Sequence, residues 1–170
     1  EMDGRTLLMK NGARIRIDDE QPQKSHADWL ARPDLKDMFR YRYDTTTEAA
    51  VPPTDHDPGR ARTSAFFDSI YGDCGNGTAQ RHLVDVAWLP RHDGGRIKVT
   101  AINGVAARLA AISTELEQLP ADRIKFLVPP AGGFNCRQIA GSAQKSPHAW
   151  GIAVDIAISN AHYWQWSKPG

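Results

Sequence analysis

Short runs in which hydrophobic and polar residues alternate occur at several places in the chain, a pattern typical of β-strands. Residues 6–9 and 14–17 flank Asn11-Gly12, a dipeptide that favours a tight hairpin turn because its residues tolerate positive φ angles. This arrangement predicts an N-terminal β-hairpin. Three further runs predict strands, at residues 83–89, 97–102 and 124–128, with the turn 91–95 joining the first two.

A different spacing, of four and three residues, predicts an amphipathic helix in the second half of the chain. The aliphatic residues that would share one face of it are Val105, Leu109, Ile112, Leu116 and Leu119. Asn103 is expected to cap this helix and Pro120 to end it. The overall expectation is an α+β fold, an antiparallel-type sheet with helices packed on it.

Shorter helices are predicted in the first half of the chain. Ser25 can cap one around residues 27–30, and Pro33 can stand in the first turn of another, from Asp34 to about Tyr41. A third helix is expected from Ser64 to Tyr71, and its buried face would carry Phe66, Phe67 and Ile70.

The distribution of apolar residues along the chain indicates how it divides into domains. Residues 45–62 are rich in proline and polar residues and are expected to form a surface arm. Residues 1–62 hold too few apolar residues for a convincing core of their own. We therefore expect an N-terminal extension over 1–62 and the main domain over 63–170.

Composition is that of an ordinary globular domain, with 41% hydrophobic and 24% charged residues. A net charge of +1 gives no basic stripe for nucleic acid, and no apolar run reaches the roughly 20 residues of a membrane span. Cys74 and Cys136 are either one disulfide of an exported protein or two buried thiols of a cytosolic one. No signal segment precedes Glu1, although one could have been removed.

The most organised chemistry lies between Ser146 and Asp155. This stretch places His148 and Asp155, both competent zinc ligands, seven residues apart. On a straight strand they would be roughly 23 Å apart, so they can share an ion only if the chain bends, as Pro147 and Gly151 permit. The alternation after Gly151 predicts that Asp155 lies in the middle of a strand, on a face of small residues.

The sequence Ser-x-His-x-x-Gly-x-Ala-x-Asp resembles the signature of the zinc D-alanyl-D-alanine carboxypeptidases and related peptidoglycan endopeptidases. Residues 132–141, which contain Arg137, resemble the segment that precedes this signature, and the likeness extends from Leu83 to Trp166. The resemblance implies a hedgehog/D-Ala-D-Ala peptidase-like fold with His148 and Asp155 as zinc ligands. It also implies that Arg137 holds a substrate carbonyl or carboxylate, supported by Ser146.

One departure from the family concerns the rest of the site. The family supplies a general base and a third ligand from a downstream Glu-x-x-His or similar, whereas no glutamate follows Glu117 here and the chain ends fifteen residues after Asp155. Catalytic zinc normally takes three protein ligands. His162 is an alternative third ligand, and we otherwise expect the chain to be a fragment that lacks the C-terminal part of its domain. Tyr163, Trp164 and Trp166 would form either a sugar platform or packing.

The function that the resemblance implies is zinc-dependent hydrolysis of peptidoglycan stem peptides in the periplasm or outside the cell. Carboxypeptidase and endopeptidase activities share this apparatus, and the sequence does not choose between them or fix an oligomeric state. Two alternatives stay open. The chain could be a catalytically incomplete wall-binding module, or His148 could be an ordinary hydrogen-bonded histidine while Asp155 pairs with Arg137.

Overall fold

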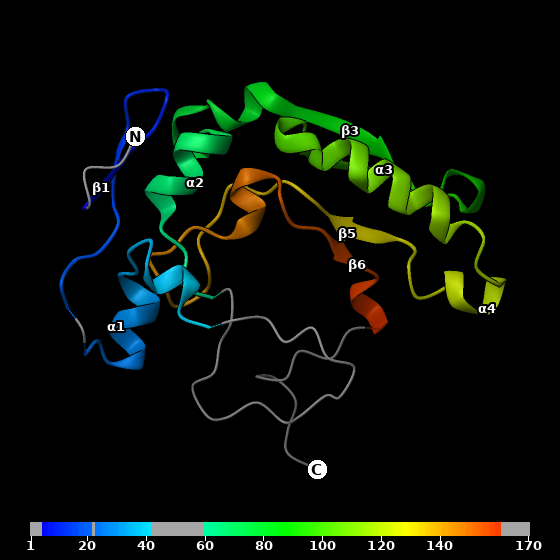
Figure 1. Ribbon diagram of the computed structural model, residues 1–170. Helices are drawn as coiled ribbons and strands as arrows, with labels where there is room; N and C mark the ends of the chain where they lie inside the picture. Colours follow the sequence, from blue (N-terminus) through cyan, green and yellow to red (C-terminus); the bar gives the residue numbers. More distant parts are fainter. Residues whose placement is uncertain (1–4, 22, 42–59, 161–170) are drawn as a thin grey trace, which may run out of the picture. The chain divides into compact units, whose positions relative to one another are not determined.

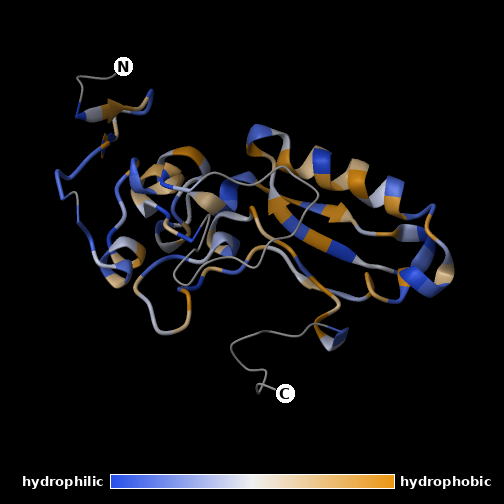
Figure 2. Ribbon diagram, turned by 60° about the horizontal axis from the view of Figure 1, so that its bottom comes forward, coloured by the Kyte–Doolittle hydropathy of each residue, from blue (hydrophilic) through white to orange (hydrophobic). Residues whose placement is uncertain are grey.

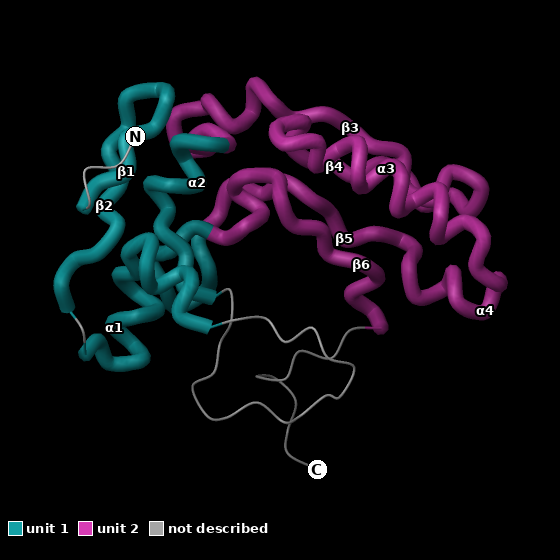
Figure 3. The backbone as a smooth tube through the Cα atoms, in the orientation of Figure 1, with its two compact units in different colours: residues 1–70, 138–145 teal, residues 71–137, 146–170 magenta. Residues whose placement is uncertain are grey.

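The computed structural model describes residues 5–21, 23–41 and 60–160 and divides the chain into two compact units (Figure 3). Unit 1 comprises residues 1–70 and 138–145, and unit 2 comprises residues 71–137 and 146–170. The expected division at residue 62 differs from this one, because unit 1 extends to Ile70 and takes in a later segment as well. The arm predicted over 45–62 lies mostly outside the described residues.

Unit 1 begins with the predicted hairpin, in which β1 (Thr6–Leu8) pairs antiparallel with β2 (Arg14–Arg16). Gly12 supplies the positive φ of the turn, +85°. Asn11 contributes differently, because its Oδ1 accepts a hydrogen bond from the Ala13 N–H at 3.1 Å. The strands are shorter than expected, and the hairpin itself is confirmed.

The first helix of unit 1, α1 (His26–Ala31), confirms the predicted cap. Ser25 Oγ accepts a hydrogen bond from the Asp28 N–H at 3.1 Å. The helix predicted from Asp34 to Tyr41 is wrong, since only a 3₁₀ turn forms, at Asp37–Phe39. The Asp37 N–H donates to Asp34 Oδ1 at 2.8 Å and the Asp34 N–H donates to Asp37 Oδ2 at 3.1 Å, a reciprocal pair that caps this short turn.

The third predicted helix is present as α2 (Ser64–Tyr71), whose expected buried face is only half-buried. Residues 138–145 belong to unit 1 because their side chains bind its helices. Ser64 Oγ donates to Gln144 Oε1 at 3.1 Å, and the Lys145 ammonium lies 2.8 Å from Asp68 Oδ2. These long-range contacts could not be expected from local sequence.

Unit 2 is built on the antiparallel pair β3 (Leu83–Ala87) and β4 (Arg96–Thr100), in register from Leu83 opposite Thr100 to Ala87 opposite Arg96. The long helix α3 (Val105–Leu116) packs against both strands (Figure 1). Hydrophilic and hydrophobic bands alternate along α3 (Figure 2). The buried core of unit 2 consists of Val86, Trp88, Leu89, Ile97, Val99 and Ile124.

The buried face of α3 differs in part from the predicted one. Val105, Leu109 and Leu116 pack on the core, whereas Ile112 is 49% exposed. Ser113 is buried instead, because its Oγ accepts a hydrogen bond from the Leu89 N–H at 2.8 Å. The residue before the helix is Gly104 rather than the expected cap Asn103.

The strand predicted over 124–128 is wrong. Pro120 precedes a short helix, α4 (Ala121–Ile124), which places Ile124 in the core. The strand of this region comes later, as β5 (Pro130–Gly132), and pairs antiparallel with β6 (Asp155–Ile156). The α+β class is confirmed, and the described strands form three two-stranded sheets rather than one.

Cys74 and Cys136 form a disulfide rather than two separate thiols. The bond ties the 3₁₀ turn Cys74–Asn76 to the segment that follows β5. Disulfides are typical of proteins that fold in oxidising compartments. In the described part of the chain, no helix has the length and apolar character needed to cross a membrane.

Candidate metal site

A tight turn follows Ser146 and reverses the chain. Residues Pro147–Trp150 form one 3₁₀ turn, and Gly151 ends it with a φ of +67°. The Gly151 carbonyl accepts a hydrogen bond from the Thr100 N–H at 3.0 Å, which fixes the turn to the end of β4. A Cβ at this position would lie 2.9 Å from both the Thr100 nitrogen and Leu83 Cδ2, so the turn requires glycine.

The turn brings His148 and Asp155 together, as the bend at Pro147 and Gly151 predicted. His148 Nε2 lies 3.4 Å from Asp155 Oδ2, longer than a good hydrogen bond. Two ligand atoms on one tetrahedral zinc ion, each bonded at 2.0–2.2 Å, are about 3.3–3.5 Å apart. The separation therefore suits a pair of atoms that share one ion.

The other ring nitrogen of His148 is already committed. Nδ1 lies 2.5 Å from the Gly133 carbonyl oxygen, and a carbonyl can only accept, so Nδ1 carries a proton. In the neutral imidazole Nε2 is then left with a lone pair that faces Asp155. The His148 side chain is only 10% exposed, so packing as well as the hydrogen bond holds this orientation. The donor chemistry of His148 thus fits a metal ligand.

The setting of Asp155 differs from the one predicted. It is the first residue of a two-residue strand rather than the middle of a long one, and its side chain is 49% exposed. The strand is short because β5 offers it only Gly132 and Pro130 as partners. A cation in solvent can therefore reach the carboxylate, whose ionised form is the one that binds metal.

Arg137 and Ser146, the proposed substrate-binding residues, meet through their backbones. The Ser146 N–H donates to the Arg137 carbonyl at 3.0 Å. Ser146 is 3% exposed, whereas Arg137 is exposed and directly follows the disulfide residue Cys136. The disulfide therefore ties the arginine-bearing segment to the rest of unit 2.

Within the described ranges, no third histidine, cysteine or carboxylate joins His148 and Asp155. His162, the alternative third ligand, lies outside those ranges, as do Tyr163, Trp164 and Trp166. The pair is thus half of a metal site as far as the described residues go.

A second cluster of potential ligands, which sequence reasoning missed, lies in unit 1. Carboxylate oxygens of Asp18, Asp19 and Asp34 lie within 4.8 Å of one another, close enough to hold a metal ion. An all-oxygen donor set suits Mg²⁺ or Ca²⁺ better than Zn²⁺. A cation is already present, because the Lys24 ammonium lies 2.6 Å from Asp19 Oδ2 and 3.6 Å from Asp34 Oδ2.

The electrostatics of this cluster are those of an ion-pair network. The hydrogen bond from Lys24 holds the pKa of Asp19 below its usual value. Burial acts to lower the pKa of Lys24, but hydrogen bonds to Asp19 and Asp37 outweigh it and raise that pKa. The hydrogen bond from Lys36 likewise lowers the pKa of Asp18. These pKa shifts of Asp18, Asp19 and Lys24 all favour the charged forms.

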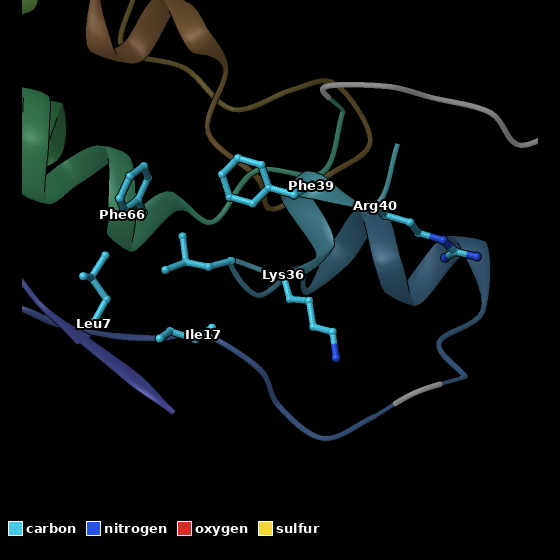
Figure 4. Close-up of a pocket in the computed structure, with 7 residues that line it drawn as sticks. Leu7, Ile17, Lys36, Phe39, Arg40 and Phe66 are labelled. Atoms are coloured by element: carbon cyan, nitrogen blue, oxygen red, sulfur yellow. The ribbon is translucent and has the colours of Figure 1, made fainter. Parts of the chain in front are cut away.

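Unit 1 also contains an open, mainly apolar pocket of about 600 Å³ (Figure 4). Its two cations serve other partners, since Lys36 lies 2.7 Å from Asp18 and Arg40 stacks 5.7 Å from the Trp29 ring centroid. In Figure 4 both side chains extend away from the aliphatic wall. The lining residues are Leu7, Ile17, Leu35, Lys36, Phe39, Arg40 and Phe66.

Comparison of the chain with protein-family models, with curated proteins and with solved structures found no match.

Proposed function

We propose that this chain carries part of a zinc peptidase site that hydrolyses peptidoglycan stem peptides, with His148 and Asp155 as two of the metal ligands. The observation that carries the proposal is the 3.4 Å separation of Nε2 and Oδ2, with Nδ1 committed to the Gly133 carbonyl. The resemblance of residues 146–155 to the peptidase signature supplies the reaction class and the hedgehog/D-Ala-D-Ala peptidase-like fold. The disulfide accords with a periplasmic or extracellular site of action.

Each residue has a defined role in this proposal. Zinc, when bound, would make its water acidic and polarise the scissile carbonyl. His148 offers a lone pair already oriented by the protein, and Asp155 offers an accessible carboxylate. Arg137 would orient a substrate carbonyl or carboxylate through its planar, paired donors, a task for which lysine is less suited. A third ligand and a proton acceptor are needed in addition to these residues.

We also consider a second function, which rests on two observations about the residues of this chain. No glutamate follows Glu117 in the sequence, and no third ligand joins the pair in the described part of the chain. A wall-binding module that kept the peptidase fold and lost its general base would have both properties. It would bind stem peptides without cleaving them.

The experiment compares hydrolysis and binding on the same substrate. Purified peptidoglycan would be incubated with the protein in the presence of Zn²⁺, and released products would be identified by mass spectrometry. Free D-alanine would indicate a carboxypeptidase, and a cut between L-alanine and D-glutamate would indicate an endopeptidase. Binding without release of products would favour the module.

A variant of His148 and a matched control variant test whether His148 belongs to the site. His148→Ala should abolish both zinc retention and hydrolysis, while His82→Ala, which removes an exposed histidine of the same unit, should leave both intact. Undiminished hydrolysis by His148→Ala would overturn the site. If the protein neither hydrolyses nor binds peptidoglycan, both proposed functions are overturned.

A further inference from the structure

Three consecutive residues after β5 hold His148 and anchor to β4. The Gly133 carbonyl accepts from the His148 ring, and the Asn135 N–H donates to the His148 carbonyl at 3.0 Å. Between them, the Phe134 N–H donates to the Lys98 carbonyl of β4 at 2.7 Å. His148 is therefore bound through both its ring and its backbone to a segment that is itself bound to the core strand.

The position of Gly133 depends on its lack of a side chain. A Cβ there would collide with the Lys98 carbonyl oxygen and would lie 2.8 Å from Ile97 Cγ2. Both obstacles belong to the buried strand β4, where Ile97 is fully buried, so neither can move aside easily. Any side chain at 133 must push the backbone, and with it the carbonyl that receives the Nδ1 proton.

We propose that Gly133 is the positioning residue of the metal site. Its carbonyl fixes His148 in the tautomer that is protonated at Nδ1, so that the Nε2 lone pair points at Asp155, and only glycine allows the carbonyl to lie where it does. Outer partners of this kind set ring orientation and tautomer in metal sites. The expected effect of Gly133 on zinc binding rests on the function proposed above. The tautomer of His148 is expected whether or not that function is correct.

The tautomer can be measured without metal. Long-range ¹H–¹⁵N correlation NMR on the metal-free full chain at mildly alkaline pH distinguishes the two ring nitrogens. His148→Gln identifies the signals by their loss. We expect His148 to show a protonated Nδ1 and an unprotonated Nε2. If Nε2 is protonated and Nδ1 is unprotonated in the wild-type chain, the proposal is overturned regardless of the results for the variants.

Two glycine variants test whether the site requires residue 133 to have no side chain. Gly133→Ala should shift His148 toward a mixture of tautomers and weaken Zn²⁺ binding, measured by calorimetry, by about tenfold or more. Gly94→Ala is the matched control, because its Cβ would also collide with a backbone carbonyl, that of Trp88. It should lower the melting temperature and leave the tautomer and zinc affinity unchanged.

The outcomes separate this proposal from the proposed function. A Gly133→Ala chain with wild-type tautomer and affinity would overturn the positioning role. Equal losses of affinity in both variants would also overturn it, since they would reflect general destabilisation. If the wild-type chain shows the expected tautomer but binds no Zn²⁺, the peptidase proposal fails and the orientation of His148 by Gly133 stands.

Discussion

Gly133 and His148 are 15 residues apart in the chain, and the carbonyl of one accepts a hydrogen bond from the ring of the other at 2.5 Å. This bond decides which nitrogen of His148 faces Asp155. A histidine whose ring is oriented in advance loses less freedom when it binds a ligand. In the site proposed above, this hydrogen bond would orient His148 toward Asp155 before a cation binds.

Replacing Asp155 by asparagine should separate binding from folding. Asn keeps the shape of the side chain but removes its charge, so we expect Zn²⁺ affinity to fall by about tenfold or more. Stability should change by less than about 0.5 kcal/mol, because the side chain is 49% exposed. Calorimetric titration and urea unfolding would measure the two effects. Asp85→Asn, whose side chain is 43% exposed, is the control, and equal affinities in the two variants would contradict the ligand role.

The disulfide should contribute strongly to the stability of unit 2. Cys74 and Cys136 are separated by 62 positions, so the chain-entropy model gives about 4 kcal/mol for closing this loop. Replacing both by serine should reduce the free energy of unfolding, measured in urea, by roughly this amount. A reductant should destabilise the wild-type chain and leave the double variant unaffected. A wild-type chain indifferent to reductant would argue against the bond.

Removing the buried cation of unit 1 should be costly. The Lys24 side chain is 4% exposed and lies against Asp19, Asp34 and Asp37, so Lys24→Met leaves three carboxylates without their counter-charge. We expect the free energy of unfolding of unit 1 to fall by about 3 kcal/mol. Amide hydrogen exchange would measure this loss. Lys36→Met removes an exposed, solvent-screened partner of Asp18 and should cost much less stability than Lys24→Met. Comparable losses of stability in both variants would contradict the expected difference between the buried Lys24 and the exposed Lys36.

The same network predicts how stability depends on pH. Folding lowers the pKa of Asp19, chiefly through the Lys24 hydrogen bond, so its contribution is complete above the unfolded value near 4 and is lost as pH falls through the folded value. Folding raises the pKa of Lys24, so that contribution is lost only as pH rises through a value above 10.5. Amide protection in unit 1 should thus decline in acid and hold from about pH 5 to 9. The decline should be shallower in Lys24→Met.

Local signals predicted those parts of the fold in which neighbours along the chain decide the structure. The Asn11-Gly12 turn, the Ser25 cap and the start of α3 at Val105 are examples. Long-range packing decided the rest. Ser113 is buried in place of Ile112 because the Leu89 N–H needs an acceptor, which no periodicity reveals.

The candidate site was predictable to a similar extent. The spacing of His148, Gly151 and Asp155 indicated that the side chains of His148 and Asp155 could converge, and they do. The tautomer of His148 could not be predicted, because it depends on a carbonyl from another part of the chain. The exposure of Asp155 was also missed, because the length of its strand is set by the few residues that β5 can pair with it.

The return of residues 138–145 to unit 1 means that the chain passes between the units three times, after residues 70, 137 and 145. A single proteolytic cut therefore cannot release one unit from the other. A truncated chain that starts at Tyr71 would keep Gln144 and Lys145 but lose Ser64 and Asp68, to which they bind. Unit 2 could be made alone by replacing this eight-residue excursion with a short linker between Arg137 and Ser146, whose backbones are already hydrogen-bonded.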